Sequence, residues 1–217
     1  MIEMKIYLSS ADYVEYLSKV AAVIKDHKDY ITMLDAETGD GDHWVNLNMG
    51  FDKLLDEKEA LKEMSLTAMF KKIAIILMST IGGSSGVLYG SAYLKASQVV
   101  DGKSKINAFL LKEILKAKLD GIMERGKAKP GFKTMIDTLY RALEYMIEAF
   151  NNNASDREVL LAMKKGAEYG MNETAQMEAV KGRACYQSDK GIGKLDPGAV
   201  TMYYQLEALA DYILEKS

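Results

Sequence analysis

Apolar residues recur at helical spacing along nearly the whole chain. Val14, Leu17, Ala21 and Ile24 lie three or four residues apart and follow Ser9-Ser10, a good N-terminal cap. Similar stripes indicate further helices over residues 47–55, 69–77, 85–99, 111–126 and 136–150, and from residues 155 and 197 onward. No alternating strand of convincing length interrupts them. The chain is therefore predicted to be all-α, with about eight helices and short connections between antiparallel neighbours.

The composition is that of an ordinary globular protein. The chain has 217 residues, 48% hydrophobic and 27% charged, a length that allows one domain over 1–217. Its net charge of −3 gives no electrostatic case for nucleic acid binding. The longest strongly apolar run, residues 73–78, is too short to span a bilayer, and the N-terminus lacks a secretion signal. The lone Cys185 cannot form an internal disulfide, so we expect a cytoplasmic protein.

The most informative stretch is residues 35–42, Asp-Ala-Glu-Thr-Gly-Asp-Gly-Asp, called here the aspartate segment. Carboxylates this close repel one another unless something positive lies between them. The two glycines allow a tight turn that could aim Asp35, Asp40 and Asp42 at one point. Mg²⁺ prefers such oxygen ligands and often shares its shell with substrate phosphates. The segment therefore predicts a metal-held phosphate site, with a solvated acidic turn as the alternative.

Two common ligand motifs are excluded by counting. An EF-hand needs acids or amides at positions 1, 3 and 5, glycine at 6 and glutamate at 12, and neither Asp35 nor Asp40 starts such a loop. No segment of the chain matches the Walker A pattern G-x-x-x-x-G-K-[ST]; Gly126-Lys127 and Gly193-Lys194, for instance, are followed by Ala128 and Leu195. A nucleotide would have to bind by another route.

Three further segments lie at expected helix ends. They are Gly82-Gly83-Ser84-Ser85-Gly86, residues 127–135 and residues 181–198. A glycine-rich helix start with serine hydroxyls is a ready anion site, and Arg183 could grip a phosphate through its planar fork. Each has a commoner explanation as a plain turn, and the lysines of 127–135 are more often solvated. Together they favour a ligand site, because a helix bundle could collect them at its ends.

These blocks resemble, in order and spacing, the nucleotide-binding L subunit of dihydroxyacetone kinase (the DhaL family) over essentially the whole chain. The matching residues are Leu34-Asp35, Gly39 to His43 and Asn46; Gly82 to Gly86 and Leu88-Tyr89-Gly90; Arg125 to Ala128, Pro130-Gly131 and Lys133-Thr134-Met135; Lys181 to Ala184, Tyr186, Ile192-Gly193 and Asp196-Pro197-Gly198-Ala199.

The resemblance implies a closed up-and-down barrel of eight antiparallel helices with ADP or ATP at one end. Two Mg²⁺ ions would then be held by Asp35, Asp40 and Asp42, and Ser84 and Ser85 would donate to phosphate. His43 and Asn46, with the backbone of Trp44 and Val45 between them, would also contact the nucleotide. Gly126 and Met135 would line the adenine pocket, and Arg183 would reach the phosphates. The Asp196-Pro197-Gly198 turn would close over the nucleoside.

The resemblance also implies a division of labour. This chain would supply no catalytic nucleophile of its own and would position the phosphoryl group through His43 and Arg183. A separate K subunit would hold the ketone covalently. A free-standing L subunit favours bound ADP that is rephosphorylated from phosphoenolpyruvate by a phosphotransferase-system protein. An ATP-dependent subunit for a related short ketose remains open, as does a homodimer; no nucleic acid or membrane partner is expected.

Two positions depart from the family pattern. Trp44 stands where the family has a glycine, and Phe132 where it has an aspartate. We interpret Trp44 as packing at a helix start, and we expect it to lie beside the nucleotide. The pair leaves open a rival function, a non-catalytic nucleotide-binding or regulatory module that uses these side chains as a surface.

Overall fold

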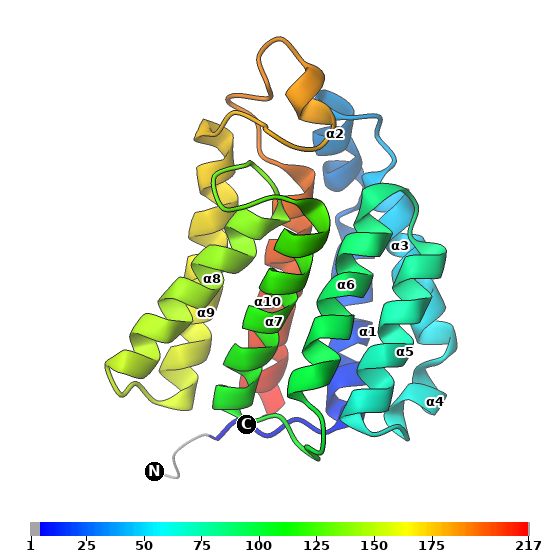
Figure 1. Cartoon of the computed structure of the whole chain (residues 1–217), viewed down its shortest axis with the longest axis vertical. Helices are drawn as coiled ribbons and strands as arrows, with labels where there is room; N and C mark the ends of the chain where they lie inside the picture. The colour runs from blue at the N-terminus through cyan, green and yellow to red at the C-terminus, as the bar shows by residue number, and fades with distance from the viewer. Residues whose placement is uncertain (1–4, 217) are drawn as a thin grey trace.

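The computed structural model describes residues 5–216, and these residues form a bundle of long helices (Figure 1). The helices are α1 (Ser10–Asp26), α2 (Lys28–Thr38), α3 (His43–Asp56), α4 (Lys58–Lys62), α5 (Leu66–Thr80), α6 (Gly83–Val99), α7 (Ala108–Gly126), α8 (Met135–Asn151), α9 (Asp156–Glu173) and α10 (Pro197–Lys216), with short 3₁₀ turns η1 (Thr174–Gln176) and η2 (Arg183–Tyr186). Within the described residues no strand forms beyond one isolated bridge, Leu8 with Ile106. The predicted all-α class is confirmed.

The eight long helices contact one another in a ring. Contacts run from α1 to α3, α5, α6, α7, α8, α9 and α10 in that order, and α10 returns to α1. The apolar stripes face inward, and the side chains of Val20, Ile24, Ile73 and Ile114 have no exposed surface. Each such side chain contributes roughly 1.5–3 kcal/mol through burial. The hydrophobic stripes of the eight helices therefore account for the core.

Two helices, α2 and α4, were not expected from the sequence. Only His27 separates α1 from α2, and its backbone N–H still bonds to the Val23 oxygen, so no chain break marks the boundary. Helix α4 has only five residues, too few to show a periodic stripe. The consequence for the site is that Asp35 belongs to the last turn of α2. The tight turn is confined to residues 39–42.

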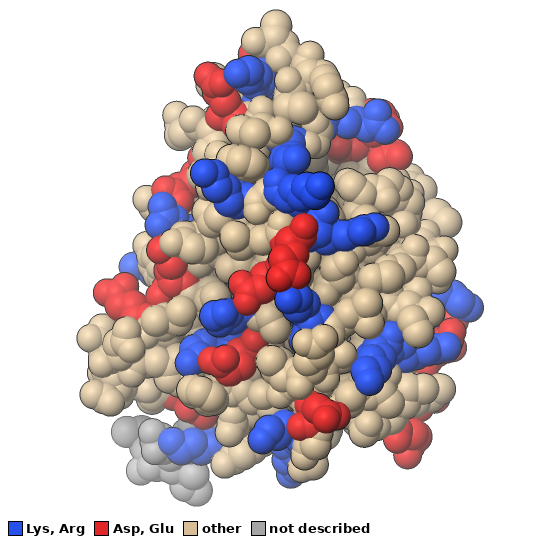
Figure 2. Space-filling model, in the orientation of Figure 1, with Lys and Arg blue, Asp and Glu red and all other residues tan. Residues whose placement is uncertain are grey.

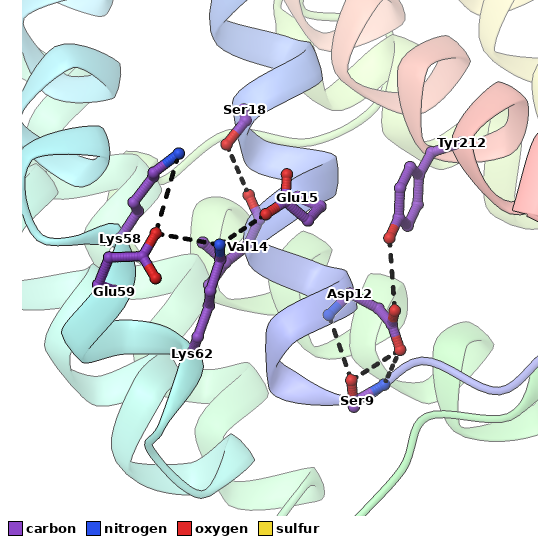
Figure 3. Close-up of polar contacts among 9 residues, drawn as sticks. All are labelled: Ser9, Asp12, Val14, Glu15, Ser18, Lys58, Glu59, Lys62 and Tyr212. Atoms are coloured by element: carbon purple, nitrogen blue, oxygen red, sulfur yellow. Dashed lines mark hydrogen bonds and ion pairs between the residues drawn. The ribbon is translucent and has the colours of Figure 1, made fainter.

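The N-terminus of α1 is anchored by a capping box (Figure 3). The Ser9 hydroxyl accepts a hydrogen bond from the Asp12 amide at 3.2 Å, and Asp12 Oδ2 accepts one from the Ser9 amide at 2.8 Å. The Tyr212 hydroxyl of α10 donates to Asp12 Oδ1 at 3.4 Å. Lys62 of α4 reaches Glu15 at 2.7 Å. These contacts join α1 to the last and the fourth helix.

No helix within residues 5–216 combines the length and the apolar character needed to cross a bilayer.

A lysine points into the aromatic part of the core. Lys118 Nζ donates to the Tyr13 hydroxyl at 2.8 Å and lies 3.9 Å from the centre of the Tyr93 ring. Withdrawal from water lowers the pKa of Lys118 to about 7. In the unfolded chain this lysine stays protonated up to a pH near its ordinary pKa of 10.5. Between these limits the unfolded state holds more protons, so the contribution of Lys118 to stability rises with pH.

We predict that replacing Lys118 by Met removes this pH dependence. The difference in free energy of unfolding, wild type minus Lys118→Met, should rise by more than about 1 kcal/mol between pH 7 and pH 9.5, as expected for a shift of more than one pKa unit. Urea denaturation at a series of pH values measures it. Lys116→Met, which alters an exposed lysine on the same helix, is the control. A difference that stays constant with pH would contradict the assignment.

Candidate functional site

A cavity of about 520 Å³ opens at one end of the helix bundle. It is bounded by the aspartate segment, the turn between α5 and α6, the loop between α7 and α8, and the segment between α9 and α10. These four segments, far apart in sequence, meet at the upper end of the molecule in Figure 1. The volume lies within the range typical of small-molecule sites. The four blocks singled out in the sequence are thus brought to one place.

The three carboxylates of the aspartate segment converge. Asp35, Asp40 and Asp42 each offer an oxygen, and these oxygens lie within 4.8 Å of one another. Asp35 is buried, whereas the other two are exposed to the cavity mouth. Oxygen-rich clusters of this kind suit a hard divalent cation such as Mg²⁺. The residues present therefore fit a metal ion.

Two glycines make this convergence possible. Gly41 has φ of +76°, a conformation that L side chains rarely adopt. A Cβ at Gly39 would lie 2.6 Å from Asp35 Oδ1, so any side chain there would displace that carboxylate. Glycine is therefore required at position 41 by the backbone conformation, and at position 39 by the space that the Asp35 carboxylate occupies.

His43 begins α3 directly after the carboxylates. Its backbone N–H donates to Asp35 Oδ2 at 3.0 Å, and its Nε2 lies 2.9 Å from the Thr201 hydroxyl of α10. Burial lowers the pKa of His43, although Asp35 and Asp42 oppose the shift. The ring lines the cavity. His43 therefore joins the metal-fitting carboxylates to the last helix.

The glycine-serine segment forms the start of α6. Gly82 is its N-cap and Gly83 has φ of +64°. Ser84 and Ser85 both line the cavity, in the first turn of the 17-residue helix. Unpaired backbone amides at a helix start attract anions. A Cβ at Gly82 would lie 2.5 Å from Asn46 Oδ1, so this glycine lets α3 and α6 share one wall of the cavity.

Another part of the cavity lining is largely apolar. It includes Gly126 at the end of α7 and Met135 at the start of α8, together with Leu88, Ile122, Ala128 and Ile136. A Cβ at Gly126 would lie 3.2 Å from the side chain of Leu88. The cavity thus has an anion-attracting side and an apolar side, an arrangement that fits a molecule with a phosphate at one end and a flat ring at the other.

Positive side chains surround the cavity mouth. Arg183 of η2 forms an ion pair with Asp40, and Arg125 and Lys181 also line the cavity. Figure 2 shows lysine and arginine side chains gathered over the loops at this end. From the sequence, only the family resemblance draws attention to Arg125 and Lys181, because nothing in their local sequence separates them from ordinary surface residues. Arg183 is 65% exposed, so water screens its pair with Asp40.

The start of α10 completes the rim. Asp196 Oδ2 accepts a hydrogen bond from the Ala199 amide at 2.7 Å, which makes Asp196 the N-terminal cap. Burial raises the pKa of Asp196 to about 7. Pro197 and Gly198 also line the cavity. The helix predicted from residue 197 onward is present, and its first turn lines the site.

The side chains of Trp44 and Val45 do not line the cavity. Trp44 Nε1 donates to the Ile24 carbonyl at 2.9 Å, and Lys28 Nζ lies 4.8 Å from its ring centre. Val45 is exposed on the outer face of α3. Successive helical residues point about 100° apart, so the face that carries His43 and Asn46 cannot carry both of their neighbours. The structure places Trp44 in packing against α1, and only the backbone of these two residues remains near the site.

The prediction that the lysines of 127–135 are solvated is wrong for Lys133. Its side chain is 1% exposed, and its Nζ donates to the carbonyl of Thr174 and, at 2.5 Å, to that of Lys194. Burial lowers the pKa of Lys133. These two carbonyls lie at the ends of the segment that carries Lys181 and Arg183. Lys133 therefore holds that segment over the cavity, a role that long-range folding creates and no local pattern reveals.

We predict that Lys133→Met loosens the segment between α9 and α10. Loss of two hydrogen bonds from a charged donor should speed hydrogen exchange at Ala179 and Gly193, whose amides bond within this segment, by about tenfold or more. Amide exchange measured by NMR checks this. Lys129→Met, which alters an exposed lysine of the same loop, should leave both rates unchanged. Equal rates in wild type and Lys133→Met would refute the role.

The chain is similar to several known proteins. The DAK2 domain family matches residues 37–211. The PEP-dependent dihydroxyacetone kinase, ADP-binding subunit DhaL, of Escherichia coli K12 is 32% identical over 203 residues, 94% of this chain and 97% of the relative. The PTS-dependent counterpart of Lactococcus lactis is 36% identical over 200 residues, 92% of this chain and 96% of the relative. Human triokinase/FMN cyclase is 30% identical, but the chain spans only 34% of it.

A solved structure shares the fold. The dihydroxyacetone kinase of C. freundii in complex with AMP-PNP and Mg²⁺ superposes with a TM-score of 0.71 at 26% identity, covering 91% of this chain and 33% of that one. The likeness thus concerns about a third of the larger kinase. Family match, full-length relatives and fold lead to one assignment: the chain belongs to the DAK2 domain family.

Proposed function

We propose that this chain is the ADP-binding L subunit of a dihydroxyacetone kinase. The observation that carries the proposal is the convergence of three carboxylates, a serine-bearing helix start and Arg183 in one cavity with an apolar wall. Relatives that match nearly the full chain are named as ADP-binding subunits of such kinases. The unit 1–217 would act as a single nucleotide-binding domain.

The proposed contacts follow the two sides of the cavity. Asp35, Asp40 and Asp42 would hold two Mg²⁺ ions, which neutralise phosphate charge when bound. Ser84, Ser85 and Arg183 would contact the phosphates. His43 and Asn46, with the backbone of Trp44 and Val45 between them, would also contact the nucleotide. Gly126 and Met135 would receive the adenine ring, with Asp196, Pro197 and Gly198 closing over the nucleoside.

The electrostatic balance supports an anionic ligand. Three carboxylates carry about three negative charges, and two Mg²⁺ ions would exceed them by about one positive charge. A cation bound at Asp40 would also compete with Arg183 for that carboxylate. The released guanidinium, with its planar fork of donors, is suited to a phosphate.

The phosphoryl acceptor would be supplied by another protein. Of the two histidines, His27 is exposed, bonds to the Val23 carbonyl and packs against the tilted ring of Tyr204, outside the cavity. His43 is held between Asp35 and Thr201. His27 thus lies away from the cavity and His43 belongs to the proposed nucleotide site, so we assign neither to covalent binding of the ketone. A K-type subunit would therefore carry dihydroxyacetone, and this chain would orient the phosphoryl group through His43 and Arg183.

Phosphoenolpyruvate, passed on by a phosphotransferase-system protein, is the proposed ultimate donor. The full-length relatives are named PEP-dependent or PTS-dependent, whereas the human relative is a longer protein. An ATP-dependent subunit for a related short ketose is the second candidate, and a regulatory nucleotide-binding module the third. Self-association as a homodimer and a cytoplasmic location stay predictions.

The test combines binding with transfer. We expect the chain to bind ADP in the presence of Mg²⁺ and to phosphorylate dihydroxyacetone only when a K-type subunit and a phosphorylated phosphotransferase-system protein are added. Asp42→Asn should weaken Mg²⁺-dependent ADP binding at least about tenfold, because a charged ligand is lost. Calorimetry and a coupled assay of ketone phosphate measure the two effects.

Asp56→Asn, the same substitution at the far end of α3, is the matched control and should behave as wild type. ADP binding without transfer in the complete mixture would favour the regulatory module. Transfer supported by free ATP alone would favour the ATP-dependent candidate. Unchanged ADP affinity in Asp42→Asn would remove the metal site from the proposal.

A further inference from the structure

The ring of His43 is fixed by a buried hydroxyl on another helix. Thr201, in the first turns of α10, has no exposed surface, and its Oγ1 lies 2.9 Å from His43 Nε2. His43 lines the cavity, and Nδ1 has no hydrogen-bond partner among residues 5–216. One ring nitrogen is therefore engaged by the protein, and the other is left for whatever occupies the site.

The other neighbour of the Thr201 hydroxyl bears on which side chain donates in this hydrogen bond. The Thr201 hydroxyl has one proton, and Oγ1 is placed to donate it to the Gly198 carbonyl at 3.2 Å. A carbonyl oxygen can only accept. Oγ1 then has lone pairs to offer to His43 and no second proton. The bond between the two side chains is satisfied when His43 Nε2 carries the hydrogen.

The surroundings of Thr201 hold it in this position. Gln205 Nε2 donates to the Thr201 carbonyl at 3.0 Å and to the Tyr89 hydroxyl at 2.8 Å. Tyr89 lies on α6 and is buried. Helices α3, α6 and α10 therefore meet at one satisfied polar network. Such networks fix the orientation of the side chain they support.

We propose that Thr201 is a positioning residue that fixes the tautomer of the uncharged His43 ring as Nε2–H whenever that form is present, with Nδ1 facing the cavity as a hydrogen-bond acceptor. The partner of Nδ1 in the site is then a hydrogen-bond donor, such as a hydroxyl group or a water molecule that bridges His43 to a phosphate oxygen. The tautomer is a property of the unliganded chain. Its effect on phosphoryl transfer rests on the proposed function.

The tautomer can be read directly by ¹⁵N NMR, because the chain has two histidines. His27 serves as an internal reference: its Nδ1 lies 2.9 Å from the Val23 carbonyl, which requires a hydrogen on Nδ1. At a pH where both rings are neutral, we expect opposite tautomers, Nδ1–H for His27 and Nε2–H for His43. A wild-type His43 with its hydrogen on Nδ1 would overturn the proposal, whatever the activity of the protein.

Variants test the part played by Thr201. Thr201→Val should convert the His43 signals to a mixture of tautomers, whereas Thr201→Ser should restore the wild-type pattern. Thr138→Val removes another buried hydroxyl, one that bonds to Ala199, and should leave His43 unchanged. If Thr201→Val folds and His43 keeps the wild-type signals, the positioning role is refuted. If Thr201→Val does not fold, the spectra of Thr201→Ser and of the wild type still show whether His43 has the predicted tautomer.

The kinetic arm separates this inference from the proposed function. In the reconstituted transfer reaction, Thr201→Val should lower kcat about tenfold or more with less than a threefold change in ADP affinity, and Thr201→Ser should recover most of the loss. Equal kcat in Thr201→Val and wild type would contradict the positioning role. If His43 has the predicted tautomer but no phosphoryl transfer occurs, the result would count against the proposed function and not against the role of Thr201.

Discussion

The mutual repulsion of three carboxylates is the constraint on which the rest of the site depends. Asp35, Asp40 and Asp42 offer oxygens within 4.8 Å of one another, and only Arg183 neutralises one of them within the described chain. A helix end fixes the first carboxylate, and a two-glycine turn returns the chain to present the others. A bound cation would lower the energy of such an arrangement. The cavity, the anion-attracting start of α6 and the basic rim are all arranged around that charge.

The helical ring explains how distant segments reach this point. Eight long helices contact one another in sequence, and α10 closes on α1. Segments at one end of such a ring necessarily face each other, so short motifs far apart in the chain become neighbours. Lys133 and Thr201 complete the arrangement from inside: one ties down the segment that carries Arg183, and the other fixes the ring of His43.

The long helices and most of the site residues could be predicted because their signals are local. Apolar stripes mark the helices, and the aspartate and glycine-serine segments carry their own chemistry. Helix α2 escaped prediction because no breaking residue separates it from α1, and Asp35 was therefore assigned to a turn. Three roles could not be predicted, because no local pattern encodes them. The roles of Lys133 and Thr201 depend on contacts between segments more than forty residues apart, and the role of Lys181 depends on where its loop lies. Trp44 was expected beside the ligand, but its helical position directs it toward α1.

The central claim is that a divalent cation and a nucleotide share this cavity through the three carboxylates. The most direct measurement is an anomalous-scattering map from crystals of the chain grown with Mn²⁺, as a substitute for Mg²⁺, and ADP. We predict anomalous density between Asp35, Asp40 and Asp42, with the phosphates of ADP on the side of Ser84 and Ser85. Anomalous density elsewhere, or ADP bound with no metal among these carboxylates, would contradict the account.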